Sequence, residues 1–187
     1  MELAFYWLIE IPVSTTAELV GVTRATAIQW YQYCRDICST KMLALQQQLG
    51  GPGHIVQIDE TLMFKRKYHV GHAAEQHWVF GMYDSHSRKG YCLHVQDRSA
   101  ATLIPIIQQW VAPGSTIYSD QWASYNGLAA LGFTHMTVNH QTNFVDPITQ
   151  ACTNQVEAFW SRLKRRLKYI SGSVGEMRWS HLDEACY

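Results

Sequence analysis

The sequence lacks most of the features that mark secreted, membrane-spanning and zinc-ribbon proteins. Its five cysteines are odd in number and no two form a CxxC pair, which argues against a disulfide framework or a zinc ribbon and favours a reducing compartment. No apolar run reaches the ~18 residues of a membrane span. The apolar start has no basic residue and no small-residue cleavage site. We therefore expect an intracellular protein with no membrane partner, in the nucleus if its source is eukaryotic and otherwise in the cytoplasm.

The chain also lacks a net charge: its 15 Lys and Arg residues balance 15 Asp and Glu residues, so the formal net charge is zero. Overall charge therefore predicts no polyanion as partner. The cations are unevenly spread, however, and five of them lie within residues 162–168. With 187 residues, 47% of them apolar, the chain is long enough for one well-buried domain with a small accessory segment.

Residues 14–38 predict two helices joined by a tight turn. Gly21 supplies the corner, and Thr23 is placed to cap the second helix. A second helix in this position would present Arg24 and Gln29 outward, and both are residue types that contact DNA in helix-turn-helix proteins. The alternative is an ordinary helical hairpin with no DNA contact.

The stretch "QQQLGGPG" marks a boundary, because a polar helix end is followed by Gly and Pro. We therefore expect a helix-turn-helix DNA-binding segment in residues 1–50 and a catalytic domain in residues 51–187. The second part is expected to alternate strands and helices. They are strands at 54–64, 77–84, 90–97, 115–120 and 134–139, and helices at 99–111, 121–132 and 153–170.

This order of elements is typical of the ribonuclease-H-like fold, an α/β fold with a mixed five-stranded sheet flanked by helices. In such a sheet the first and fourth strands are neighbours. Asp59 lies in the middle of the first strand and Asp120 at the end of the fourth, so the two side chains are expected to meet. Glu157 lies one turn inside the final helix and supplies a third acid.

Three converging carboxylates are what a two-metal phosphoryl-transfer site needs. Their hard oxygen atoms suit two Mg²⁺ or Mn²⁺ ions. Each acid also has a purely structural interpretation. Asp59 could pair with Lys65 or Arg66, Asp120 could cap the helix after it, and Glu157 could be a solvated helix residue. Their joint placement on the three expected elements favours the metal site.

The final helix is strongly basic beyond Glu157. Lys164 falls two helical turns after Glu157, hence on nearly the same face, and it is surrounded by Arg162, Arg165, Arg166 and Lys168. A basic helix that leaves a metal site is well placed to bind a phosphate backbone. The alternative is a solvated charged face.

Several ordered blocks of the sequence resemble one known family. The blocks "HIVQIDET", "HWVFGMYD", "GFTHMTVNHQTNFVDP" and "TNQVEAFWSRLKRRL" are similar to successive blocks of the Merlin-type DDE transposases and their bacterial insertion-sequence relatives. The resemblance covers residues 54 to about 170. The 36 residues between Asp120 and Glu157 also fit the spacing of that family.

This resemblance implies a cut-and-paste DNA transposase. Such a protein binds terminal inverted repeats, cleaves DNA and joins its 3′ ends to target DNA, and synapsis of two DNA ends implies a homo-oligomer. By position, Asp59, Asp120 and Glu157 would form the catalytic triad. Lys164 matches a basic residue after the third acid, Asn154 is a lesser site residue, and His140 falls in a family block near the site.

Two other functions remain open. Full-length relatives usually carry a longer N-terminal part, which favours a domesticated, transposase-derived DNA-binding protein without catalysis. A ribonuclease-H-like nuclease that hydrolyses DNA without joining it is the other alternative.

Overall fold

The computed structural model describes residues 1–44, 48–63, 77–139, 143–169 and 177–186. The chain forms two compact units. The first contains the N-terminal helices and α6 as far as Ala185, and the second contains the strands, α4 and α5. Helix α6 therefore belongs to the N-terminal unit, whereas the sequence predicts a single catalytic domain over residues 51–187. No helix in the described ranges has the length and apolar content needed to cross a membrane.

Four helices make up the first unit: α1 (Glu2–Leu8), α2 (Val13–Val20), α3 (Arg24–Ala44) and α6 (Met177–Cys186). The turn between α2 and α3 has the predicted chemistry. Gly21 ends α2 in the left-handed conformation, with φ at 71°, and the Thr23 hydroxyl accepts a hydrogen bond from the Thr26 amide at 3.2 Å. The two helices predicted around this turn are confirmed, although α3 runs six residues past Cys38.

One part of the core of this unit is an aliphatic cluster. Leu3, Ala17 and Ala27 are buried together, with valines around them. The Thr16 hydroxyl lies 2.7 Å from the Tyr31 hydroxyl, which donates to the Ile11 carbonyl at 2.8 Å. Helix α6, which the sequence analysis did not predict, belongs to the same unit.

The second unit contains the predicted five-stranded sheet. Its strand order is β4-β3-β2-β6-β7. Strand β3 runs antiparallel to its neighbours, whereas β2, β6 and β7 are parallel to one another. The strands are β2 (Ile55–Met63), β3 (His77–Asp84), β4 (Lys89–Val95), β6 (Thr116–Ser119) and β7 (Thr134–Thr137). This topology confirms the mixed ribonuclease-H-like fold.

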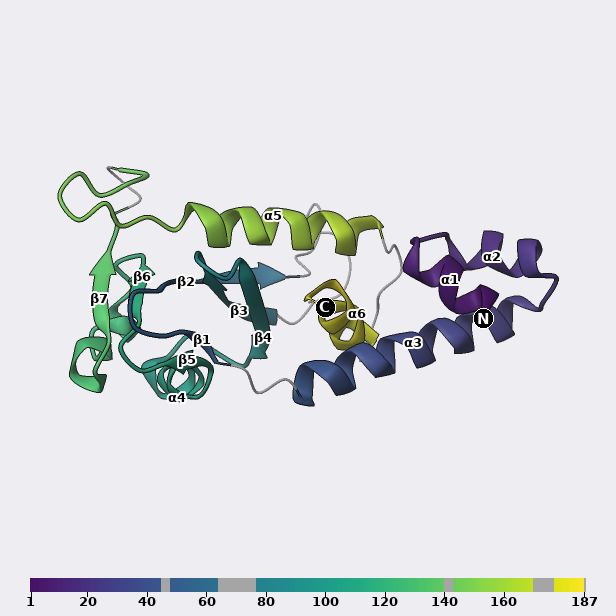
Figure 1. Ribbon diagram of the computed structural model, residues 1–187, viewed down its shortest axis with the longest axis horizontal. Coiled ribbons are helices and arrows are strands. Elements are labelled where there is room, and N and C mark those ends of the chain that lie inside the picture. The colour runs from purple at the N-terminus through teal and green to yellow at the C-terminus, as the bar shows by residue number, and fades with distance from the viewer. Residues whose placement is uncertain (45–47, 64–76, 140–142, 170–176, 187) are drawn as a thin grey trace, which may run out of the picture. The chain divides into compact units, whose positions relative to one another are not determined.

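Two helices cover the sheet from opposite sides (Figure 1). Helix α5 (Asn154–Tyr169) packs on β2 and β3, and α4 (Ala100–Trp110) lies on the other side. Helix α4 begins as predicted, because the Ser99 hydroxyl accepts from the Thr102 amide at 3.3 Å. Val56 and Ile58 of β2 are fully buried, and the core of the unit lies around this central strand.

Two details of this unit differ from the sequence prediction. A short second sheet pairs β1 (Leu49–Gly50) with β5 (Val111–Ala112), and neither strand was expected. The helix predicted at 121–132 is instead two 3₁₀ turns, η1 (Ala123–Tyr125) and η2 (Leu128–Leu131). The Trp122 indole and the Ser124 hydroxyl donate to the backbone carbonyl of Arg98, and these bonds tie the segment to the residues before α4.

Candidate active site

The first turn of α5 is capped by a side chain of the sheet. Gln57 is buried in β2, and its Oε1 accepts hydrogen bonds from the amides of Gln155 at 2.9 Å and Val156 at 3.1 Å. The first amides of a helix have no partner within the helix, so a buried helix start needs such an acceptor. Gln57 therefore fixes the start of α5, and with it Glu157, against the strand that carries Asp59.

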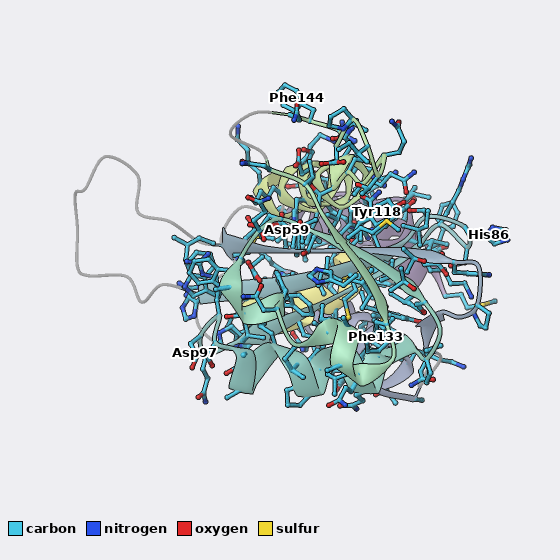
Figure 2. All side chains as sticks on the ribbon, turned by 90° about the vertical axis from the view of Figure 1, so that its left-hand side faces the viewer. Asp59, His86, Asp97, Tyr118, Phe133 and Phe144 are labelled. Atoms are coloured by element: carbon cyan, nitrogen blue, oxygen red, sulfur yellow. The ribbon has the colours of Figure 1, made fainter. Side chains whose placement is uncertain are left out.

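Asp59 lies two residues further along β2, on the same face of the sheet. It is half-buried, and its Oδ2 accepts a hydrogen bond from the indole Nε1 of Trp160 at 3.0 Å. Figure 2 shows it on the side of the sheet that α5 covers. Gly81 of β3 pairs with Asp59, and a Cβ at Gly81 would overlap the Trp160 ring. Glycine at this position therefore makes room for the indole that binds Asp59.

Thr61, two residues beyond Asp59 in β2, makes a third contact with α5. The Thr61 hydroxyl accepts a hydrogen bond from the Nζ of Lys164. Two residues of a strand advance by about 6.7 Å and four residues of a helix by about 6 Å, so the two periods nearly match. This match lets alternate residues of β2 contact successive turns of α5. Lys164 itself is exposed on α5, and its side chain reaches the sheet at Thr61.

Asp120 follows directly after β6, the parallel neighbour of β2. Gln57 and Tyr118 form the last pair of that ladder, and Asp59 and Asp120 each lie two residues beyond this pair on the neighbouring segments. The Asp120 Oδ1 accepts from the Trp122 amide at 2.9 Å. The capping role considered for Asp120 is thus present, at the turn that leads into η1.

The pKa of Asp59 depends on its burial and on the acids near it. Burial raises the pKa of Asp59 to about 6, and the negative charges of Asp120 and Glu157 add to this rise. The hydrogen bond from Trp160 and one from the Glu60 backbone act in the opposite direction, because they stabilise the ionised form. A nearby cation would relieve the same repulsion.

Glu157 is the exposed member of the three predicted acids. Its Oε1 accepts a hydrogen bond from the Thr153 hydroxyl at 3.0 Å. Within the described ranges, no three His, Cys, Asp or Glu side chains are arranged to hold a metal ion. The three acids lie on the elements predicted for them, and their joint binding of metal stays a prediction.

A fourth acid of the region, Glu60, was not assigned a role from the sequence. Strand alternation points it to the sheet face opposite Asp59, where it accepts a hydrogen bond from the buried Tyr125 hydroxyl. Burial raises its pKa to about 7; the Tyr125 hydrogen bond and the charge of Arg98 lower it, and the charges of Asp59 and Asp120 raise it. The adjacent acids in "IDET" were the signal available for this site in the sequence.

The remaining predicted site residues are spread over both units. Asn154 is the exposed first residue of α5, and three basic residues further along α5 are exposed: Arg162, Arg165 and Lys168. Arg24 and Gln29 are exposed on α3, where the Arg24 Nε donates to the Ser14 hydroxyl at 3.4 Å and the Gln29 Nε2 to the Tyr33 hydroxyl at 2.9 Å. His140 lies outside the described residues. DNA binding by any of these residues stays a prediction.

Comparisons with known proteins agree with this fold. The ISXO2-like transposase domain matches residues 48–186. An uncharacterized transposase-like protein of Haemophilus influenzae is 36% identical over 84 residues, which are 45% of this chain and 67% of that protein.

Solved structures of integrases are also similar. The simian T-cell lymphotropic virus intasome in complex with PP2A regulatory subunit B56 gamma has a TM-score of 0.50 and 20% identity, over 100% of this chain and 67% of that chain. The catalytic core domain of BIV integrase has a TM-score of 0.48 and 16% identity, over 71% of this chain and 80% of that chain. The match at 20% identity shows a shared fold. Because the ISXO2-like domain matches well over half of its length, this chain belongs to the ISXO2-like transposase family.

Proposed function

We propose that this chain is a DDE transposase that cleaves DNA and transfers the resulting strand to target DNA. The carrying observation is the placement of the three acids: Asp59 is in β2, Asp120 follows β6, the parallel neighbour of β2, and Glu157 is in α5, which packs on β2. Membership of a transposase family supports a reaction on DNA. The finer assignment to the Merlin type, terminal inverted repeats as the bound ends, and a homo-oligomeric assembly are parts of the same proposal.

In this proposal Asp59, Asp120 and Glu157 hold two Mg²⁺ or Mn²⁺ ions. Carboxylate oxygens are the ligands these ions prefer. When bound, the ions would activate water or a DNA 3′-hydroxyl and stabilise the leaving oxygen. The chain's own part is positioning: Trp160 orients Asp59, and the Trp122 amide orients Asp120. Glu157 would exchange its hydrogen bond with Thr153 for a place in the triad.

The exposed cations of α5 would hold the DNA backbone beside these acids. Arg162, Arg165 and Lys168 point into solvent, while Lys164 reaches the sheet at Thr61. Phosphate contacts of this kind bind DNA regardless of its sequence and weaken with salt. Reading of the terminal repeat would fall to the first unit, with Arg24 and Gln29 of α3 as contact residues.

Metal-dependent nicking of labelled DNA tests this proposal. Inverted repeats in the DNA that flanks the gene would define the substrate. We expect wild-type protein to nick this DNA with Mg²⁺, and Asp120→Asn to abolish nicking while DNA binding is retained. Asp97→Asn is the control, because Asp97 is an exposed acid of the same unit. Nicking that survives Asp120→Asn would contradict the assignment.

A strand-transfer assay separates transposition from plain hydrolysis. We expect the 3′ ends to be joined to a target plasmid in the presence of Mg²⁺. Nicking without any joined product would favour the hydrolysing nuclease, and DNA binding without nicking would favour the domesticated binding protein.

A further inference from the structure

The guanidinium group of Arg98 is stacked between two tryptophan rings. Its Cζ lies 4.0 Å from the ring centroid of Trp78 and 4.5 Å from that of Trp122. Trp78 is in β3, Arg98 precedes α4, and Trp122 follows β6, so the stack joins three separate segments. A cation this close to an aromatic face is attracted by the charge distribution of the ring.

Hydrogen bonds fix this stack to Asp120. The Trp122 amide donates to Asp120 Oδ1 at 2.9 Å, and the Trp122 indole Nε1 donates to the Arg98 carbonyl at 3.0 Å. The Ser124 hydroxyl donates to the same carbonyl at 2.7 Å. Two hydrogen bonds on one carbonyl hold the stack in place, so its position relative to the acid of the active site is defined.

The stack still offers a ring surface and a charge to the solvent. Trp122 remains 39% exposed although Arg98 covers part of its ring. Arg98 is half-buried, and within the described residues no ion pair joins it to a carboxylate. Its positive charge also lowers the pKa of Glu60. An exposed indole beside a half-buried cation is an arrangement suited to a flat ligand with a negative charge next to it.

An unpaired nucleotide has this chemistry, since its base has a free aromatic face and its phosphate is anionic. A base inside a duplex has both faces covered by its neighbours, so the ligand must come from a melted or frayed strand. Stacking of single-stranded bases on aromatic side chains, with Arg nearby, is a general mode of nucleic-acid binding. The location next to Asp120 places such a base close to the phosphate that the active site would cleave.

We propose that the Trp78–Arg98–Trp122 stack binds one unpaired nucleobase of the DNA strand at the active site. The base would stack on Trp122, and Arg98 would face the phosphate that adjoins it. This inference rests on the proposed function, because it takes DNA as the substrate.

Fluorescence of 2-aminopurine tests this inference. One probe is a transposon-end duplex with the analogue in a short single-stranded 3′ extension, and the other is a blunt duplex with the analogue paired. EDTA is present, so that binding is measured without cleavage. We expect wild-type protein to quench the extended probe on binding. Trp122→Ala should abolish this quenching and weaken the affinity for that probe about tenfold, with no change for the blunt duplex.

Matched variants keep the result interpretable. Trp122→Phe retains an aromatic ring and should restore part of the quenching, which shows that the loss in Trp122→Ala is not a folding defect. Leu131→Ala removes an apolar side chain of the same unit that is equally exposed, at 39%, and should change nothing. If wild-type protein binds neither probe, the proposed function fails and this inference with it. If wild-type protein binds both probes and Trp122→Ala quenches as strongly, only the inference about the stack fails.

Discussion

Two adjacent acids of β2 have different surroundings at the predicted site. Asp59 and Glu60 are adjacent, yet alternation along the strand points them to opposite faces of the sheet. Asp59 meets the indole of Trp160, and Glu60 meets the hydroxyl of Tyr125. Both carboxyl groups have raised pKa values, mainly because they are buried. Hydrogen bonds to each carboxyl group favour its ionised form.

The packing of Trp160 on Gly81 gives a prediction at this scale. Gly81→Ala should lower the free energy of unfolding by about 1–3 kcal/mol, because the added methyl group would overlap the indole ring. Urea denaturation measures the effect. Gly127→Ala is the matched control: no atom lies within 4 Å of a Cβ there, and the backbone φ of −84° suits alanine. Equal behaviour of the two variants would contradict the packing argument.

Helix α5 and strand β2 form the element pair on which the proposed site depends. Three alternate residues of β2 bind three places along α5: Gln57 binds the first amides, Asp59 binds Trp160 and Thr61 binds Lys164. The similar repeat distances of the strand and the helix make this pairing possible. A shift of β2 by one residue in its pairing register would turn all three side chains to the other face of the sheet.

Loss of the Gln57 acceptor should be costly. In Gln57→Leu the amides of Gln155 and Val156 lose their buried acceptor, and we expect unfolding to become easier by about 1–3 kcal/mol. Cleavage of DNA should fall as well, because Glu157 is carried by this turn of α5. Urea denaturation and the nicking assay measure the two effects. The control Gln96→Leu alters an exposed residue; if both variants behave alike, the capping role is wrong.

The turn between β3 and β4 depends on one buried carboxylate. Asp84 accepts hydrogen bonds from His54, from the amides of Gly50, His86 and Ser87, and from the Ser87 hydroxyl. Burial would raise the pKa of Asp84, but the hydrogen bonds from His54, His86 and Ser87 outweigh burial and lower it to about 2.

This low pKa predicts how stability depends on pH. The folded protein holds Asp84 ionised at lower pH than the unfolded chain, whose Asp pKa is about 3.9. The stabilisation is therefore complete above about pH 4 and is lost as pH falls toward 2. Urea denaturation of wild-type protein and Asp84→Asn across this range should give a stability difference that shrinks with acid. A difference that does not change with pH would contradict the assignment.

The molecule as a whole combines two compact units, and the residues proposed to contact DNA lie in both. Arg24 and Gln29 belong to the helical unit, and the basic residues of α5 belong to the unit with the sheet. The family match spans residues 48–186 and so includes the entire sheet. Net charge is zero, so DNA binding would depend on these local clusters and not on the overall field.

Salt dependence tests the basic face of α5. Arg165→Ala should reduce the slope of log affinity against log salt by about 0.9, the value for one lost phosphate contact on duplex DNA. The affinity should fall by a similar factor for every DNA sequence, because phosphate contacts carry no sequence information. Lys89→Ala, an exposed cation of β4, is the control. An unchanged slope in Arg165→Ala would remove α5 from the proposed DNA interface.

The sequence by itself determined the five strands of the main sheet, the two helices around Gly21, α4 and α5, and the placement of the acids along them. The β-favouring residues of "HIVQIDET" predicted a strand with Asp59 inside it, and Ser99 and Gly21 marked helix ends that the structure confirms. These signals were sufficient because side-chain period and capping act over a few residues. The order of the elements then restricted the sheet to one common topology, and the observed strand order agrees with it.

Tertiary structure alone decided the partners of these residues. The Gln57 cap on α5 and the Trp160 hydrogen bond to Asp59 join residues about a hundred positions apart, and the Arg98 stack joins three segments. The same holds for the region 121–132, which forms two 3₁₀ turns in place of the predicted helix and is tied to Arg98 by hydrogen bonds from Trp122 and Ser124. Such contacts depend on packing between distant segments, and no local pattern of residues carries that information.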